Sequence, residues 1–421
     1  MRSNNYATIS SRAWYGDEEL RLNFPDGWEI QMLSPRDTSK LSETEIQAAF
    51  DQPIGTPRIA ELAKRKRSAA IIVDDLSRPT PASEVVPFLL RELIQAGVPK
   101  SEIRFVVGGG SHRGLTDDEI ARKIGADAAA EYEVVNHDFM AGDLRALGNL
   151  DSGLPIYINP VVADADFKIC LGGIYPHRSV GFGGGAKLIL PGVAGYASIF
   201  YFHEYHPKRG RAIIEGNGDE PDLRDAAEAV AEVLGLDVIV NIVTNSKREV
   251  GGVFVGDFVK AHRVGSQFAL ETYATPISDH IREETDVLLL NCYPLDWDPI
   301  QTGKSLWARA YFDNAYTVIV NPATEGVCYH GLSDQIDYPR FAKRSAAQKP
   351  MPLPAPKIGS REQALVWSDL FPVDAFYKRH PNDILFREWD TLIQMLAGKL
   401  PRHAKVTVFP CTSTQILVDG D

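Results

Sequence analysis

Residues 69–107 read AAIIVDDLSRPTPASEVVPFLLRELIQAGVPKSEIRFVV. The β-branched run at 69–74 predicts a buried strand, and IRFVV at 103–107 predicts a second strand. Between them, apolar residues recur at helical spacing over 83–95 and Gly97 closes the run, which predicts a helix. A strand, a helix and a further strand in this order are typical of a parallel βαβ unit. This part of the chain therefore predicts an α/β domain.

The same alternation continues toward the C-terminus. Thr116 and Glu119 have the spacing of a capping box and predict a helix that ends near Gly125. Further strands are expected at 132–136, 167–171, 238–243, 287–290 and 316–320, and further helices at 221–234 and about 256–270. The Pro-rich segment 349–357 cannot continue a helix or a central strand, so we expect a surface connector there.

The chain is long enough for two domains. It has 421 residues, and a domain usually holds about 100 to 200 residues. The apolar periodicity lapses at 274–279, where Pro276 interrupts it, and a new strand begins at 287. We therefore predict an α/β fold of two domains with mainly parallel Rossmann-like sheets, at 1–273 and 274–421. A return of the last strand to the first domain is left open.

Composition disfavours several classes of protein. Acidic residues outnumber basic residues by 56 to 44, and the formal charge of -12 disfavours a nucleic-acid or anionic-membrane surface. The N-terminus has no apolar leader segment, and no apolar run reaches the roughly 18 residues that a membrane span needs. The four cysteines form no CxxC pair. We expect a soluble, cytoplasmic protein without nucleic-acid or membrane partners, and its oligomeric state stays open.

Four polar loops follow predicted strands directly. They are DDLSRPTP at 74–81, GGGSHRGLT at 108–116, GGIYPHRSVGFGGGAK at 172–187 and NCYPLDWDPIQTGK at 291–304. Open parallel sheets bind ligands outside the carboxyl ends of their strands. Three of these loops belong to the predicted first domain and one to the second, so we expect an active-site cleft between the domains.

Two loop histidines, His112 and His177, are candidates for proton transfer. A neutral imidazole can accept or donate a proton at physiological pH. Taken alone, each histidine is better explained by a structural hydrogen bond. Their shared position at strand ends favours catalysis.

Positive charges at the same strand ends suit a small carboxylate. Arg78 and Lys304 could bind it, Arg78 in a bidentate manner. Gln301 lies one helical turn before Lys304 and can both donate and accept. The alternative for Arg78 is a salt bridge to Asp74 or Asp75.

The run GFGGGAK at 181–187 is rich in glycine. Its glycines allow a close backbone approach and offer N–H donors to a phosphate, which makes Gly183, Gly184 and Gly185 candidates for cofactor binding. The run is no P-loop, because Ala186 precedes the lysine and Leu188 follows it. It also fits G-x-G-x-x-A, but no strand directly precedes it, so a dinucleotide site is weakly supported. Lys187 is either a solvated side chain or a ligand or covalent nucleophile, and the glycines favour the latter.

His203 and His206 lie three apart in SIFYFHEYHP at 198–207. That spacing places both imidazoles on one helical face, where they could share a metal. A zinc site needs three or four ligands, and no motif supplies the others. The pair alone therefore does not predict a self-contained zinc site.

These segments resemble the nickel-dependent lactate racemase family. The resemblance is carried by DDLSRPTP, GSHRGLT, YPHRSVGFGGGAKLILPG and the Q-x-x-K of QTGK, in this order across 74–304. It implies a two-domain α/β fold and a nickel-pincer nucleotide, a pyridinium-derived mononucleotide that holds nickel through two sulfurs and a ring carbon. It also implies accessory enzymes that make this cofactor as partners.

The resemblance assigns roles by position. Lys187 matches the lysine to which the cofactor is covalently tethered, and His203 matches the nickel ligand of the protein. His112 and His177 match the two catalytic bases. The positions that match substrate-anchoring groups are Arg78, Gln301 and Lys304.

The implied reaction is a racemisation or epimerisation at C2 of a 2-hydroxy acid. Deprotonation at carbon would create a carbanion that histidine is too weak a base to form. In the implied mechanism one histidine removes the hydroxyl proton while a hydride passes from the α-carbon to the cofactor, which leaves a 2-oxo acid. Four residues near the substrate depart from the expected lactate pattern, so lactate and a longer or bulkier 2-hydroxy acid both stay open. They are Ser111, Trp297, Pro299 and Ile300.

Two other classes of function stay open. An NAD-dependent oxidoreductase or lyase would use 181–186 for a dinucleotide and the same histidines for proton transfer. A non-enzymatic protein that binds a carboxylate or nucleotide has no evident need for two imidazoles and a reactive lysine. A mass adduct on Lys187 and turnover without added NAD would favour the racemase over both.

Overall fold

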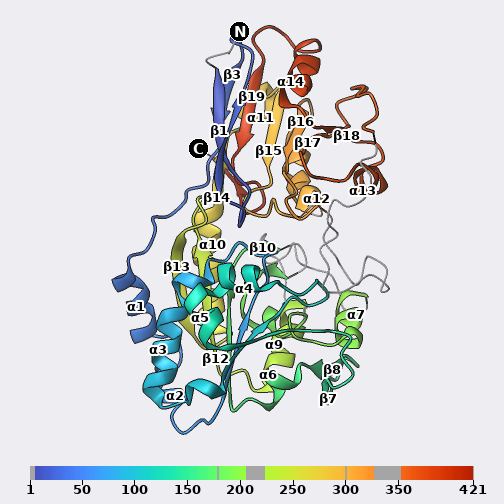
Figure 1. The fold of residues 1–421 in the computed structure, drawn as a ribbon. Helices are drawn as coiled ribbons and strands as arrows, with labels where there is room; N and C mark the ends of the chain where they lie inside the picture. Colours follow the sequence, from blue (N-terminus) through green and yellow to red (C-terminus); the bar gives the residue numbers. More distant parts are fainter. Residues whose placement is uncertain (1–4, 178–179, 205–222, 299–300, 327–351, 421) are drawn as a thin grey trace. The chain divides into compact units, whose positions relative to one another are not determined.

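A computed structural model describes residues 5–177, 180–204, 223–298, 301–326 and 352–420 (Figure 1). The chain divides into two compact units. We call Thr38–Glu271 the first unit, and the described residues of 5–37, 272–326 and 352–420 the second unit. Each unit contains a six-stranded sheet with parallel strands and helices, which confirms the predicted α/β class.

The first unit is built on a sheet with the strand order β13-β12-β9-β4-β5-β6. Neighbouring strands are parallel except for β12 and β13. Residues of β4, β9 and β12 are buried along the whole of each strand, as expected for parallel strands covered on both faces. The strands are β4 (Ala69–Val73), β5 (Ile103–Val107), β6 (Glu133–Asn136), β9 (Phe167–Gly173), β12 (Val238–Thr244) and β13 (Val250–Gly256).

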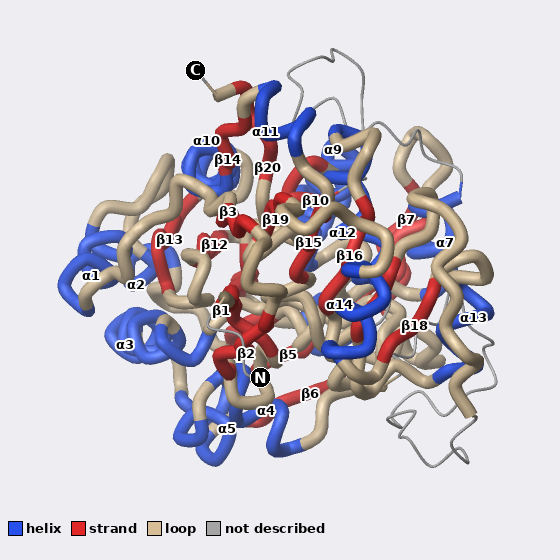
Figure 2. Tube along the Cα trace, turned by 90° about the horizontal axis from the view of Figure 1, so that it is seen from above, coloured by secondary structure: helices blue, strands red, loops and turns tan. Residues whose placement is uncertain are grey.

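Helices and two antiparallel hairpins complete the first unit. Figure 2 shows α1, α2 and α3 grouped together beside β13. The helices are α1 (Glu43–Asp51), α2 (Ile59–Leu62), α3 (Val86–Ala96), α4 (Asp117–Ile124), α5 (Ala126–Glu131), α6 (Pro160–Asp164), α7 (Tyr196–Glu204), α9 (Leu223–Leu234) and α10 (Lys260–Tyr273). Shorter 3-10 turns are η1 (Ala82–Glu84), η2 (Lys100–Glu102) and η3 (Gly185–Leu188). The hairpins join β7 (Arg145–Asn149) to β8 (Pro155–Ile158) and β10 (Pro176–His177) to β11 (Gly181–Phe182).

The second unit has a fully parallel sheet in the order β18-β17-β16-β15-β19-β3. Its strands are β3 (Glu29–Met32), β15 (Val287–Asn291), β16 (Tyr316–Val320), β17 (Leu365–Trp367), β18 (Ile384–Phe386) and β19 (Lys405–Phe409). Two further pairs are β1 (Tyr6–Ser11) with β2 (Glu18–Asn23) and β14 (Ala274–Ile277) with β20 (Ile416–Asp419). The helical segments are α11 (Asp279–Glu284), α12 (Gln301–Ser305), η4 (Leu306–Tyr311), α13 (Val373–Arg379) and α14 (Trp389–Ala397).

The N-terminal residues differ from the predicted domain boundaries. Residues 5–37 belong to the second unit, because β3 pairs in parallel with β19 along its whole length. Ile9 of β1 is buried in the same core as Val406 of β19. The last strand, β20, pairs with β14 inside the second unit and does not return to the first unit.

Candidate active site

Three loops of the first unit leave neighbouring strands at one edge of the sheet. They follow β4, β5 and β9, which are adjacent and parallel, so their carboxyl ends meet. Hydrogen bonds also connect the loops. The Gly173 N–H donates to Asp74 Oδ2 at 2.9 Å, and the Gly110 N–H donates to Gly192 O at 2.8 Å. The segments 74–81 and 108–116 and the described residues of 172–192 therefore lie together.

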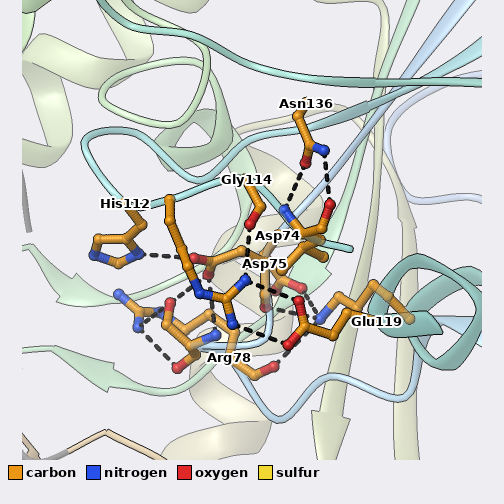
Figure 3. A network of polar contacts seen from close by, with 11 residues as sticks. Asp74, Asp75, Arg78, His112, Gly114, Glu119 and Asn136 are labelled. Atoms are coloured by element: carbon orange, nitrogen blue, oxygen red, sulfur yellow. Dashed lines mark hydrogen bonds and ion pairs between the residues drawn. The ribbon is translucent and has the colours of Figure 1, made fainter. Parts of the chain in front are cut away.

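His112 is oriented by Asp75. Its Nδ1 lies 2.7 Å from Asp75 Oδ2 (Figure 3). The other carboxylate oxygen of Asp75 accepts hydrogen bonds from the Ser77 N–H, at 3.1 Å, and from the Ser77 hydroxyl. Because a carboxylate only accepts, a neutral imidazole carries its proton on Nδ1 and its lone pair on Nε2. Nε2 is therefore the atom of His112 that can take a proton from a substrate.

Asp75 is ionised although its side chain is buried. Burial alone raises the pKa of a carboxyl group. Here the His112 imidazole, the Ser77 hydroxyl and the Arg78 guanidinium outweigh burial and hold the pKa of Asp75 below its ordinary value. An ionised Asp75 stabilises the positive charge that His112 acquires when it takes a proton.

Arg78 does not form the salt bridge with Asp74 or Asp75 that we considered from the sequence. Asp75 contacts His112, and Asp74 forms an ion pair with Lys123. The guanidinium of Arg78 instead donates to the Ser77 carbonyl at 3.0 Å and to the Ser77 hydroxyl at 3.1 Å. Among the described residues Arg78 has no ion-pair partner, so its charge suits a carboxylate ligand.

Buried polar contacts fix the loop 108–116 that carries His112. Arg113 and Glu119 form a buried bidentate ion pair with N–O distances of 2.8 and 2.9 Å. The Glu119 side chain also accepts a hydrogen bond from the Thr116 N–H, which confirms the predicted capping box at the start of α4. At the end of β6, the Asn136 amide accepts from the Leu115 N–H and donates to the Leu115 carbonyl, both at 2.8 Å (Figure 3).

The carbonyl groups of the glycine run contact buried side chains. Arg224 donates to the carbonyl oxygens of residues 182–184, at 3.1 Å for Gly184. His262 Nε2 lies 2.9 Å from Gly183 O. Burial, followed by the charge of Arg224, holds the pKa of His262 well below its ordinary value, so the imidazole is neutral and donates from Nε2.

Two N–H groups of the same run are used inside the protein. The Gly183 N–H donates to Tyr175 O at 2.8 Å, and the Gly185 N–H donates to Asn241 Oδ1 at 3.0 Å. The expectation that these two groups are offered to a phosphate is therefore wrong. Their acceptors come from the preceding loop and from β12, which the local sequence does not reveal.

Glycine is needed in this run because the backbone is close to its neighbours. A Cβ at Gly184 would lie 2.9 Å from Asn241 Oδ1, and Gly184 has φ 73°. A Cβ at Gly185 would lie 3.0 Å from His262 Cδ2 at φ 56°. Lys187 follows directly within η3 and is partly buried. Hydrogen bonds to Asn241 and His262 hold the run directly before Lys187.

His177 lies in the loop that also contains Lys187. It ends β10 and pairs with Gly181 of β11. The two strands form a short hairpin, and the 3-10 turn η3 follows it instead of a long helix. The strand–turn–helix context of a dinucleotide site is therefore missing at 181–186.

His203 is near the end of α7. Its Nδ1 lies 2.8 Å from the Ile199 carbonyl one turn earlier. A carbonyl only accepts, so Nδ1 carries the proton and Nε2 has the lone pair that a metal would bind. The described residues include no group of three or more His, Cys, Asp or Glu side chains that could hold a metal alone. His206 lies outside the described residues.

Gln301 and Lys304 belong to α12 of the second unit, which follows β15. Their side chains are outside the described part of the structure. Asn321 Nδ2 donates to the Thr302 hydroxyl at 2.8 Å and so fixes the start of this helix. The predicted cleft between the domains stays a prediction.

Several residues that hold the site were not predicted as site residues. Asp75 had a signal, because it follows a strand and precedes Arg78. The other four come from helices and a strand distant in sequence, and they are Lys123, Arg224, Asn241 and His262.

A parallel sheet that carries an aspartate-oriented histidine at its carboxyl edge is typical of an α/β enzyme with acid–base chemistry. The family described as "Lactate racemase N-terminal domain" matches residues 15–212. The lactate racemase of Lactiplantibacillus plantarum is 30% identical over 393 residues, which cover 88% of this chain and 90% of that protein. The lactate racemase of Thermoanaerobacterium thermosaccharolyticum is 30% identical over 325 residues, covering 74% of each.

Solved structures agree in fold. The lactate racemase apoprotein of Thermoanaerobacterium thermosaccharolyticum superposes with a TM-score of 0.69 at 23% identity, covering 98% of this chain and all of that one. A Thermotoga maritima protein gives a TM-score of 0.60 at 16% identity over 91% of this chain. The chain belongs to the lactate racemase family, and it is an isomerase of the racemase class. None of the helices in the described ranges is long and apolar enough to span a membrane.

Proposed function

We propose that the protein inverts the C2 centre of a 2-hydroxy acid by proton-coupled hydride transfer with a nickel-pincer nucleotide tethered to Lys187. The observation that carries the proposal is the Asp75–His112 pair, which aims a proton-accepting Nε2 from the same edge of the sheet as the Lys187 loop. An imidazole can act as a general base and remove the proton of a hydroxyl group.

The residues present fit such a cofactor. Lys187 follows a glycine run whose backbone is hydrogen-bonded to Asn241, Arg224 and His262, so the backbone just before the lysine is held in place. His203 has its lone pair on Nε2, and a single protein ligand suffices if the cofactor brings the other nickel donors. When bound, the cofactor supplies an electrophile that accepts a hydride from the α-carbon and returns it.

Each histidine serves one face of the substrate. His112 takes the hydroxyl proton at Nε2, and Asp75 stabilises the imidazolium that forms. His177, from the loop after β9, handles the proton on the opposite side. Two bases match a reversible interconversion, because each enantiomer then meets its own proton acceptor.

The substrate carboxylate is held by cations. Arg78 can bind it through two parallel N–H groups, and Lys304 and Gln301 add a charge and an amide. A fixed carboxylate keeps the 2-oxo acid in place until its other face is reduced. The relatives are named lactate racemases. For this chain we propose lactate or a longer 2-hydroxy acid as the substrate.

Partners follow from the cofactor. We propose that accessory biosynthetic enzymes load the chain in the cytoplasm and that neither nucleic acid nor membrane takes part.

Intact-mass and nickel analysis of protein produced with those enzymes, followed by a chiral screen of 2-hydroxy acids, tests the proposed function. The expected result is an adduct on Lys187, bound nickel and racemisation without added NAD. Loaded protein that converts no 2-hydroxy acid would refute the function.

A further inference from the structure

Lys123 contacts the backbone of the loop that carries Arg78. Its ammonium group is fully buried, at 0% exposure. It donates to the carbonyl oxygens of Asp75, Arg78 and Thr80, each at 3.2 Å. One cation therefore holds three carbonyl groups within a six-residue segment.

Asp74 is the counter-ion of this lysine and extends the contact to a second loop. One carboxylate oxygen forms an ion pair with Lys123. The other accepts from the Thr80 hydroxyl at 2.7 Å and from the Gly173 N–H at 2.9 Å. The loops after β4 and β9 are thus joined through one buried carboxylate.

The helix that carries Lys123 also begins at the loop of His112. α4 starts after Thr116, the N-cap residue, which is the last residue of the loop 108–116. Lys123 therefore connects α4, which begins at the loop of His112, to the backbone of Asp75 and Arg78. Asp75 in turn orients the ring of His112.

Stability alone gives no reason for a charge at this position. A buried ion pair loses its hydration, and replacing such pairs with apolar residues of similar size is often neutral or stabilising. A methionine would fill nearly the same volume without that cost. What methionine cannot do is donate hydrogen bonds to three carbonyl groups and form an ion pair with a carboxylate.

We propose that Lys123, with Asp74 as its counter-ion, is a positioning residue that sets both the substrate-anchoring Arg78 and the Asp75–His112 pair. It touches no reacting atom. The proposal deepens the proposed function, and its kinetic test rests on that function.

The test compares Lys123→Met with Lys168→Met. Lys168 is a second buried lysine of the same unit that also donates to a carbonyl, that of Ala165 at 2.7 Å. It lies at the start of β9, at the opposite end of the strand from the site. Both variants lose the ammonium group of a buried lysine, but only Lys123→Met removes contacts with the 74–80 loop.

The first readout needs no activity. In ¹⁵N-histidine NMR spectra of the cofactor-free chain, the Nδ1–H proton of His112 bonded to Asp75 should give a downfield signal, identified by its absence in His112→Ala. We expect Lys123→Met to lose or shift this signal and Lys168→Met to keep it. An unchanged signal in Lys123→Met would overturn the proposal.

The second readout is steady-state racemisation per loaded enzyme, with loading measured by intact mass. We expect Lys123→Met to raise KM and to lower kcat/KM by about 100-fold, because small displacements of positioning groups have effects of that size. Lys168→Met should keep both constants even if it unfolds at a lower temperature. A wild-type KM in Lys123→Met would also contradict the proposal, because a purely structural lysine changes only the folded fraction.

A second variant covers the case in which Lys123→Met does not fold. Asp74→Asn keeps the shape of the side chain and removes the counter-ion, and we expect it to change both readouts in the same direction. If loaded wild-type protein racemises no 2-hydroxy acid, the proposed function fails, while the imidazole signal still decides whether Lys123 positions His112.

Discussion

At the residue scale, one carboxylate determines which nitrogen of His112 can act as a base. Asp75 accepts the Nδ1 proton at 2.7 Å and leaves the lone pair on Nε2. Asparagine has the same shape, but its NH₂ group can donate to Nδ1 and so move the imidazole proton to Nε2. The chemistry of His112 therefore depends on the charge at position 75 as well as on its geometry.

We expect Asp75→Asn to lower kcat by about 10³-fold or more, because the wrong tautomer cannot accept the substrate proton. Racemisation is measured per loaded enzyme. Ser77→Ala is the control, since it removes the hydroxyl contacts with Asp75 and Arg78 and leaves the His112–Asp75 contact in place. Turnover of Asp75→Asn equal to that of Ser77→Ala would contradict this account of His112.

Replacement of either histidine should abolish racemisation. We expect His112→Ala and His177→Ala to fold and to load the cofactor on Lys187, with His112→Ala unfolding at a lower temperature because it leaves the buried Asp75 carboxylate without its imidazole partner. Intact mass, thermal unfolding and a chiral assay check the three points. Normal turnover of the double variant would remove both residues from the mechanism.

A third histidine predicts a pH dependence of stability. His137 is buried with Nε2 2.8 Å from Ala194 O, and burial lowers its pKa from 6.5 to about 4. As the pH falls below 6.5, His137 becomes protonated in the unfolded chain but stays neutral in the folded chain. The stability of the folded chain should therefore decrease between these two values, by up to about 3 kcal/mol.

His137→Gln removes this titration and keeps an N–H donor for Ala194. We expect wild-type protein to lose more unfolding free energy than the variant when the pH is lowered from about 8 to about 5. Urea unfolding at both pH values measures the difference. An equal loss in the two proteins would show that His137 does not titrate in this way.

At the scale of secondary-structure elements, the sequence predicted those strands and helix starts that depend on residues close together in the chain. The strands at 103–107 and 316–320 are confirmed at both ends, and the capping box at Thr116 is confirmed because its bonds span only three residues. β3 was missed, since EIQM has little apolar periodicity and is defined by pairing with β19. The use of the Gly183 and Gly185 N–H groups was likewise unpredictable, because their acceptors are not local.

The glycine run is the element on which the proposed tether at Lys187 depends. We expect Gly184→Ala to lower the fraction of chains with an adduct on Lys187 and to destabilise the protein by about 1 to 3 kcal/mol, because its φ is 73° and its Cβ would contact Asn241. Gly142→Ala is the control, since a Cβ there meets nothing within 4 Å. Intact mass and urea unfolding provide the two readouts.

Equal loading of the Gly184→Ala variant and the Gly142→Ala control would contradict the importance of this backbone.

At the scale of the whole molecule, the two sheets and the change near residue 272 were predictable from alternation and from the lapse in periodicity. The place of residues 5–37 was not, because it depends on strand pairing across most of the chain. Of the site, His112 and Arg78 lie where their strand-end loops predicted. Of the buried partners that hold them, Asp75 has a sequence signal, whereas Lys123 has none.

The central claim is that the hydrogen on the α-carbon leaves as a hydride and returns to the same carbon, while the histidines move only the hydroxyl proton. Racemisation of one enantiomer of a 2-hydroxy acid in D₂O by the loaded protein tests it directly. The account predicts product that keeps its α-hydrogen and contains no deuterium at that carbon. One deuterium gained per inversion would mean that a base removes the α-proton, and the account would be contradicted.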